Sequence, residues 1–119
     1  MTGSVVGRRS LSDNRGVASL FRGLSDPTRL RILELLIETG ELRVVDLVAV
    51  LDLAQSTVSA HLACLRGCGL IDVRHAGRQS FYRLATVDVA ELVRVAHGLH
   101  EATGCVAADC ANSGIAATR

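Results

Sequence analysis

The chain has 119 residues, enough for one domain with a modest core, and 49% of them are hydrophobic while only 3% are aromatic. This composition favours packed helices with a core of Leu, Val, Ile and Ala over a β-sandwich. A formal net charge of +1 gives no general argument for a nucleic-acid partner, and no segment has the apolar length of a signal peptide or a membrane span. We therefore expect a soluble, cytoplasmic protein whose four cysteines stay reduced and serve as ligands or reactive thiols.

The N-terminal third of the chain predicts an arm followed by two helices. Residues 1–14 lack hydrophobic periodicity and are expected to be a flexible arm. Residues 15–24 place apolar side chains on one helical face. Asp26 and Pro27 are typical of an N-cap followed by proline in the first turn, and the helix that they open is expected to end at Gly40.

The middle of the chain predicts a helix-turn-helix. After an extended link at residues 41–44, residues 45–51 predict a short helix, and residues 52–53 a tight turn into a second helix. Val58, Leu62 and Leu65 would be buried, which leaves small polar side chains on another side, as a helix in the major groove requires. The candidate DNA contacts on this helix are Gln55, Ser56, Thr57, Ser59, His61 and Arg66. Ala54 stands where a capping Ser or Asp is expected, so the first turn lacks a side-chain cap.

Two cysteines lie on this same predicted helix. Cys64 and Cys68 are four residues apart, which places their Cβ atoms roughly 5–6 Å from each other, close enough for both sulfurs to bind one metal ion. A single helical cysteine is more often a small buried hydrophobic residue. A pair on a polar flank, with two more cysteines in the C-terminal tail, favours a ligand role.

The hydrophobic period changes to two after Gly69. Residues 70–75 and 78–84 flank Ala76-Gly77 and predict a β-hairpin. Between residues 54 and 84, four arginines face a single acid, so this region is locally basic although the whole chain is not. Arg74 and Arg78 are the candidate DNA contacts here, with Arg78 at the hairpin tip.

The C-terminal part predicts a long helix over residues 87–102 and a flexible tail over residues 103–119. In so small a chain the apolar side of this helix has little left to cover, so we expect it to form a dimer interface with the first helix. His97 and His100 are spaced for one helical face. Exposed histidines are the simpler interpretation, and a weak second zinc site remains open.

This order of elements, mainly α with a small β-hairpin (α-α-α-α-β-β-α), is that of a dimeric winged helix-turn-helix. Several linked motifs resemble the ArsR/SmtB family of repressors over residues 15–102: Asp26-Pro-Thr-Arg-Leu-Arg-Ile-Leu33, Gln55-Ser-Thr-Val-Ser-x-His-Leu62, Leu65-Arg66, Gly69-Leu-Ile71 and Gly77-Arg-x-x-Phe-Tyr-Arg83. The resemblance implies a DNA-binding and dimerisation domain. It also implies a homodimeric repressor that binds a palindromic operator and leaves it when metal binds. We find no nucleophile set or phosphate-binding loop, so an enzyme is not expected.

Members of the family have metal-sensing sites at several positions, and the ligand residues of only some of these sites are present in this chain. Arg43 and Val45 stand where one common site has cysteines, and the residues after Asp88 do not match a common zinc site. The run Cys64-Leu-Arg-Gly-Cys-Gly-Leu70 does resemble the cadmium- and lead-sensing branch, in which a tail cysteine supplies a third sulfur. That resemblance implies Cys110 as the third ligand, with Cys105 as the second choice or an additional ligand.

Three thiolates favour Cd(II) or Pb(II), and As(III) or Zn(II) are the alternative inducers. Two other functions stay open. A thiol redox-sensing repressor would use the cysteines as disulfides, and a constitutive winged helix would use a zinc ion for structure alone.

Overall fold

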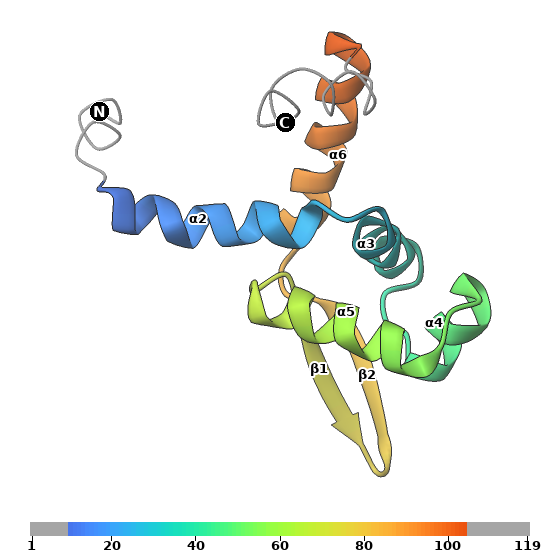
Figure 1. Cartoon of the computed structure of the whole chain (residues 1–119). Coiled ribbons are helices and arrows are strands. Elements are labelled where there is room, and N and C mark those ends of the chain that lie inside the picture. Colours follow the sequence, from blue (N-terminus) through green and yellow to red (C-terminus); the bar gives the residue numbers. More distant parts are fainter. Residues whose placement is uncertain (1–9, 105–119) are drawn as a thin grey trace, which may run out of the picture.

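Five helices and a two-stranded antiparallel hairpin make up residues 10–104, the part of the chain that this computed structural model describes (Figure 1). The elements are α2 (Leu11–Leu24), α3 (Pro27–Thr39), α4 (Val44–Leu51), α5 (Gln55–Gly67), β1 (Ile71–Ala76), β2 (Gln79–Leu84) and α6 (Val87–Thr103). This is the predicted winged helix-turn-helix order. Residues 1–9 and 105–119, which hold most of the expected arm and tail and both Cys105 and Cys110, lie outside the described residues.

Helix α2 begins at Leu11, four residues before the predicted start, so the assignment of residues 11–14 to the arm was wrong. The reason is a capping box. The Ser10 hydroxyl accepts a hydrogen bond from the Asp13 backbone N–H at 3.3 Å, and the Asp13 carboxylate accepts one from the Ser10 N–H at 3.0 Å. Two N–H groups that would be unpaired at the helix start are satisfied in this way, and the helix begins at Leu11 with Ser10 as its N-cap.

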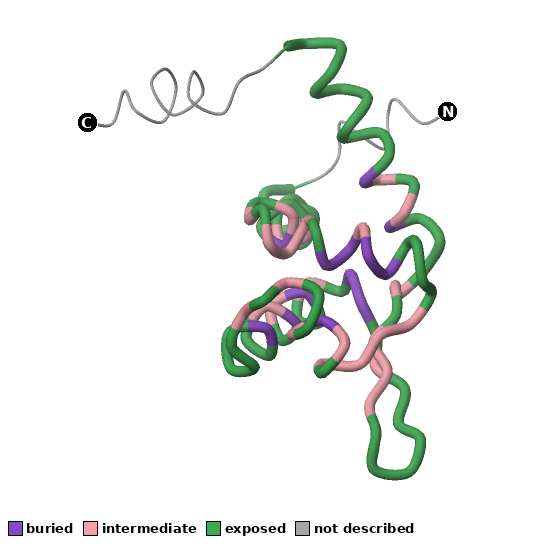
Figure 2. The backbone as a smooth tube through the Cα atoms, turned by 90° about the vertical axis from the view of Figure 1, so that its right-hand side faces the viewer, coloured by how far each residue is buried: buried purple, intermediate pink, exposed green. Residues whose placement is uncertain are grey.

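Helix α3 occupies the centre of the molecule. Its start is the predicted one, because the Asp26 carboxylate accepts hydrogen bonds from the N–H groups of Thr28 at 2.8 Å and Arg29 at 3.1 Å. The helix is followed by Gly40 at φ 92°. Four of its residues are buried and form the middle of the core: Ile32, Leu33, Leu35 and Leu36. Figure 2 shows this buried stretch with the other elements placed around it.

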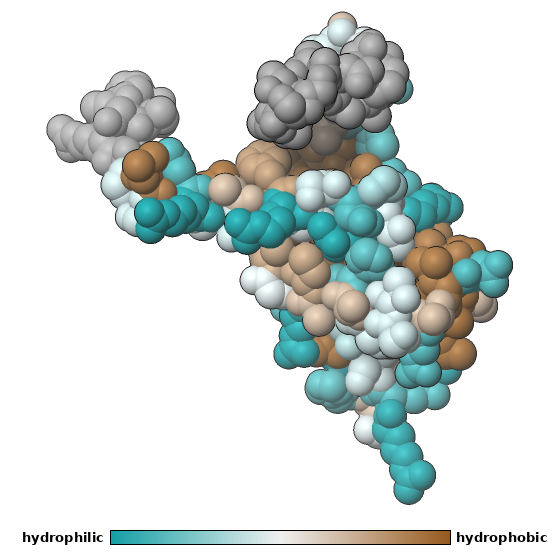
Figure 3. All heavy atoms as spheres, in the orientation of Figure 1, coloured by the Kyte–Doolittle hydropathy of each residue, from teal (hydrophilic) through white to brown (hydrophobic). Residues whose placement is uncertain are grey.

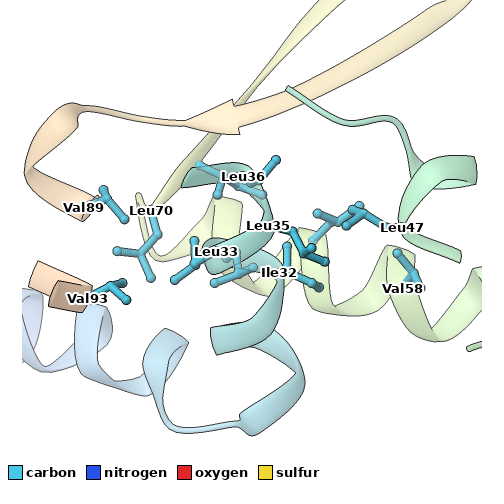
Figure 4. Packing of buried hydrophobic residues seen from close by; sticks show 12 residues of the cluster. Ile32, Leu33, Leu35, Leu36, Leu47, Val58, Leu70, Val89 and Val93 are labelled. Carbon is cyan, nitrogen blue, oxygen red and sulfur yellow. The ribbon is translucent and has the colours of Figure 1, made fainter. Parts of the chain in front are cut away.

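The core is built from aliphatic side chains of every element except α2 and β2, as the composition predicted. Leu47, Val58, Leu70, Val89 and Val93 meet the α3 side chains in the close view of Figure 4. All of these residues are at most 6% exposed. Helix α5 thus contributes one buried face to the core and leaves its other sides free.

Helices α4 and α5 form the predicted helix-turn-helix, with an angle of 116° between them. Asp52 adopts a left-handed conformation at φ 55° in the connecting turn. No single helix among residues 10–104 is long and apolar enough to cross a membrane, and α4 and α5 meet those criteria only when taken together across their bend.

The hairpin projects from the body of the molecule as a wing (Figure 1). Strand pairs run from Ile71 with Leu84 to Ala76 with Gln79, so the two turn residues are Gly77 and Arg78. The turn therefore lies one residue later than predicted. Gly77 has a φ of 64°, and a tight hairpin needs this conformation at the first turn position. The extended link also joins the sheet, through a bridge between Leu42 and Tyr82.

Candidate nucleic-acid interface and thiol site

The first half of α5 presents a free polar surface. Four of the predicted DNA contacts are exposed there: Gln55, Ser56, Thr57 and Ser59. Within residues 10–104 their side chains form no hydrogen bond, and Ala54 provides no side-chain cap, as expected. Val58, Leu62 and Leu65 anchor the opposite face in the core. The polar side chains are small and unpaired on a rigid helix, which suits close approach to base edges.

The other two predicted DNA contacts on α5, Arg66 and His61, differ in their exposure. Arg66 is exposed and lines a hollow between α5 and the wing, together with Ser59 and Tyr82. His61 is half-buried, and its Nδ1 lies 3.5 Å from Nη1 of Arg29 on α3. His61 therefore points into the molecule, unlike the other five residues of the predicted set.

Of the three arginines of the wing, the two predicted DNA contacts, Arg74 and Arg78, have different surroundings. Arg74 donates from Nε and Nη2 to the two carboxylate oxygens of Glu41, at 3.0 and 2.8 Å, and its guanidinium lies 4.7 Å from the Phe81 ring centroid. These donated bonds hold the pKa of Glu41 below its usual value. Arg78 is exposed in the turn and, within the described residues, is in no ion pair. Figure 3 shows the hydrophilic hairpin tip projecting furthest from the body.

The second half of α5 carries the thiol pair. Cys64 and Cys68 are both half-buried and both free. Burial raises the pKa of the Cys68 thiol, and the neighbouring Cys64 raises it further. Cys68 is the C-cap residue of α5, and its N–H donates to the Cys64 carbonyl at 3.0 Å. The two thiols are thus near enough for Cys64 to influence the pKa of Cys68, and their joint role as metal ligands stays a prediction.

The end of α2 lies directly against Cys68, a contact that the sequence did not reveal. A Cβ atom at the buried Gly23 would lie 3.4 Å from the Cys68 sulfur and only 2.7 Å from Leu70 Cδ1. The lack of a side chain at Gly23 thus lets α2 approach α5. A glycine inside an otherwise apolar helix face was the available signal for such a close approach.

Arg29 joins the three helices at this junction. Its Nε donates to the Gly23 carbonyl at 3.1 Å and its Nη2 to the Arg22 carbonyl at 3.0 Å, while Nη1 contacts His61. Carbonyls at the end of a helix lack partners within the helix. Arg29 supplies one for the Gly23 carbonyl and adds a further one for the Arg22 carbonyl, which also accepts from Ser25. The sequence motif that contains Arg29 was recognised, but nothing in it indicated this role.

Two soft thiols on one helix fit a thiophilic metal ion as part of a ligand set. Among residues 10–104 no third Cys, His, Asp or Glu completes a group that would hold a metal. The predicted additional ligands, Cys105 and Cys110, lie outside the described residues. His97 contacts Glu34 at 2.7 Å and His100 is exposed, so neither histidine belongs to a three-ligand group in this part of the chain.

Comparison with known proteins identifies the fold and the function class. The sequence profile of the bacterial regulatory proteins of the arsR family matches residues 26–73. The HTH-type transcriptional regulator CmtR of Mycobacterium tuberculosis is 45% identical over 95 residues, which cover 76% of this chain and 80% of CmtR. The chain belongs to the arsR family.

Two solved structures share the winged-helix architecture of this arsR-family protein. The homodimeric winged helix-turn-helix DNA-binding domain Mb0332 from Mycobacterium bovis superposes with a TM-score of 0.73 at 31% identity, covering 79% of this chain and 86% of that one. The NMR structure of the cadmium metal-sensor CMTR from Mycobacterium tuberculosis has a TM-score of 0.55 at 48% identity, covering 63% and 76% of the two chains.

A second curated relative is the arsenical resistance operon repressor of Escherichia coli, 50% identical over 66 residues, which cover 56% of each chain. These relatives are named as regulators or repressors of transcription. The arsR-family chain described here is accordingly a DNA-binding transcriptional regulator and not an enzyme.

Proposed function

We propose that the protein is a metal-responsive repressor that acts in the cytoplasm. As a metal-free homodimer it binds a palindromic operator, and it dissociates when Cd(II) or Pb(II) binds to Cys64, Cys68 and a tail cysteine. One observation carries the proposal: the thiol pair and the polar surface that suits the major groove lie on the same helix, α5.

The side chains of the first half of α5 and the basic wing would provide the DNA contacts. Gln55, Ser56, Thr57 and Ser59 would meet base edges or phosphates in the major groove, and Arg78 would reach the adjacent backbone or minor groove. Arg66 follows on the same helix, between the two cysteines. Arg66 would connect the two cysteines to the DNA-binding surface, because any shift of this turn of the helix moves the charged Arg66 guanidinium near the DNA.

A homodimer is supported by exposed apolar side chains on the two helices that were predicted to form its interface. On α2 these are Leu11, Val17 and Phe21, and on α6 they are Val95 and Leu99, each 40% exposed or more. Such residues are costly to leave in water. The winged helix-turn-helix domain Mb0332, which shares this fold, is itself described as homodimeric.

The choice of metal rests on the donor atoms. Thiolates are soft ligands and favour Cd(II) or Pb(II) over hard cations. Cys110 is the first candidate for the third sulfur and Cys105 the second candidate or an additional ligand. Zn(II) and As(III) are the alternative inducers, the latter because a relative of this chain is an arsenical resistance repressor.

Metal and operator would compete through one rigid element. The second half of α5 is packed against α2 and α3, so a change at the thiols shifts the orientation of the first half. A coupling of about 1–3 kcal/mol between two such sites is usual. Switching the protein from mostly DNA-bound to mostly DNA-free needs about 5 kcal/mol. The summed coupling free energies of the two metal sites in a dimer would approach this value.

The test measures operator affinity with and without Cd(II), Pb(II), Zn(II) and As(III). A duplex selected from random sequences by the metal-free protein serves as the operator. Cys64→Ser and Cys68→Ser should abolish release by metal while they preserve metal-free binding. Cys110→Ser and Cys105→Ser then identify the third ligand. A metal response that survives both α5 substitutions would refute the proposal.

A thiol redox repressor predicts the opposite pattern. Peroxide would then release DNA without metal, and EDTA would change nothing. A structural zinc predicts that chelation unfolds the protein instead of leaving it bound to DNA.

A further inference from the structure

The hollow between α5 and the wing is lined by residues of both elements. Its full lining consists of Ser59, Leu62, Ala63, Arg66, Gly67 and Tyr82. Three of these residues on α5, Ser59, Ala63 and Gly67, follow one another at intervals of four and are small and exposed. Residues at this spacing lie on one side of a helix, so α5 presents a recessed strip to the wing.

Tyr82 is the wing residue of this hollow, and its position is fixed from two sides. Its backbone pairs with Val73 of β1, and it exchanges two backbone hydrogen bonds of 2.8 and 3.0 Å with Leu42. The side chain is half-buried and packs against the core. Within residues 10–104 the phenol oxygen of Tyr82 has no hydrogen-bond partner, and no buried side-chain oxygen there lacks one, so this oxygen reaches the surface.

Three side chains of the lining can donate hydrogen bonds. These are the Ser59 hydroxyl, the Arg66 guanidinium and the Tyr82 phenol, and none of them has an acceptor in the part of the chain that the structure describes. Arg66 is the only charged residue of the lining, so the hollow has one positive charge and no carboxylate. Such a donor set favours an anion, and Arg, Ser and Tyr are among the side chains that bind phosphate oxygens in protein–DNA complexes.

The place of the hollow in the fold indicates which anion it binds. A DNA backbone strand borders the major groove on each side. With α5 in this groove, the wing lies beside the groove, and one of the two backbone strands passes between α5 and the wing. The hollow opens between the same two elements, so a phosphodiester of that strand is the ligand that its position favours.

We propose that this hollow binds one phosphodiester of the operator backbone and that Tyr82 donates a hydrogen bond to it. Arg66 supplies the positive charge and Ser59 a second hydroxyl. The donors are in place before DNA binds, because the sheet holds Tyr82 and the buried face of α5 holds the helix that carries Ser59 and Arg66. This inference rests on the DNA-binding part of the proposed function and does not depend on the metal.

The test replaces one backbone phosphate of the operator duplex at a time with an uncharged methylphosphonate and measures the affinity of the metal-free, full-length protein. The decisive variant is Tyr82→Phe, which retains the ring and removes only the hydroxyl. We expect it to bind the unmodified operator about three- to tenfold more weakly and to be less sensitive than wild type at one phosphate position of each half-site. The slope of log affinity against log salt should not change, because no charge is lost. Arg66→Gln should lose sensitivity at the same position and reduce that slope by about one.

Ser80→Ala is the matched control on the same strand. The Ser80 hydroxyl lies 3.0 Å from Nδ1 of His75 and does not line the hollow. This variant should therefore keep the wild-type sensitivity at the position that Tyr82→Phe identifies. Free phosphate has the same chemistry as the backbone phosphate. If inorganic phosphate shifted the NMR signals of the Tyr82 ring while Tyr82→Phe kept the wild-type methylphosphonate pattern, the hollow would be a site for the free anion and the proposal would be wrong.

Wild-type operator affinity in Tyr82→Phe, or an equal loss at every modified position, overturns the phosphate site. Thermal unfolding shows whether the variant is folded. If Tyr82→Phe were unfolded, Ala63→Leu would decide, because it fills the hollow from an exposed position of α5. It should lose the same phosphate contact, and a wild-type pattern would overturn the proposal. Failure of the metal response is distinct, since it would appear in the wild-type protein and leave the methylphosphonate pattern unchanged.

Discussion

The two halves of α5 differ in what surrounds them. In the first half, Ser56, Thr57 and Ser59 are exposed and, within residues 10–104, make no side-chain hydrogen bond. In the second half, Cys68 lies against Gly23 of α2 and His61 contacts Arg29 of α3. One half is open to an external partner and the other is attached to the helices that support it. A helix divided in this way transmits a change at its attached half to its open half.

Removing the core contact that both halves share should have the largest effect. Leu62 lies near the middle of α5 and is 1% exposed. Leu62→Ala should lower the free energy of unfolding by about 2–5 kcal/mol, measured by urea denaturation. Ser59→Ala, on the exposed face three residues earlier, should change it by less than about 0.5 kcal/mol and yet weaken operator binding. Unchanged operator affinity in Ser59→Ala would show that Ser59 does not contact DNA.

The contact between α2 and the thiol half can be disrupted at Gly23. A methyl group there would lie 2.7 Å from Leu70 Cδ1, so Gly23→Ala should destabilise the fold by about 1–3 kcal/mol and expose Cys68 to thiol reagents. Gly16→Ala is the control on the same helix, with nothing within 4 Å of the added methyl. It should stabilise the protein by about 0.5–1 kcal/mol through helix propensity. If the two substitutions stabilised equally, the packing of Gly23 against α5 would be contradicted.

The start of α3 supports the thiol half indirectly, because α3 holds Arg29. The N–H groups of Arg29 and Thr28 donate to Asp26 and hold its pKa below the usual 3.8. Asp26→Ala should lower Tm by a few degrees at neutral pH. A carboxylate with a lowered pKa stabilises the fold above its unfolded pKa and loses that effect as pH falls through its folded pKa. The difference in Tm between wild type and Asp26→Ala should therefore be full above about pH 5 and shrink in acid; a difference that did not change with pH would contradict the charged cap.

The sequence predicted the elements because their signals are local. Periodicity located the buried face of α5, and Asp26-Pro27 located the start of α3. The capping box at Ser10 and Asp13 was also a local signal, and overlooking it placed the start of α2 too late. What the sequence did not show depends on contacts between distant residues. Arg29 and His61 are 32 positions apart, and Arg74 and Glu41 are 33 positions apart.

The pairing of Arg74 also changes the interpretation of the wing. The sequence placed Arg74 and Arg78 together as DNA contacts, because both are basic residues of the hairpin. The structure gives Arg74 a carboxylate partner within the molecule and leaves Arg78 exposed at the tip. No local pattern distinguishes these two arginines, since the difference comes from Glu41.

The smallest expected effect is on operator binding, where substitution of Arg78 and substitution of Arg74 should change the salt dependence differently. Arg78→Gln should weaken operator binding and reduce the slope of log affinity against log salt by about one, as the loss of one phosphate contact does. Arg74→Gln should weaken binding with little change of slope, because Arg74 fixes the base of the wing through Glu41 and Phe81. Neither substitution should alter the urea midpoint much, since both residues are exposed. A reduced salt slope in Arg74→Gln would mean that Arg74 leaves Glu41 and contacts a phosphate when DNA binds. The wing would then be remodelled by its partner, whereas an unchanged slope means that the free protein already holds the wing in its DNA-binding arrangement.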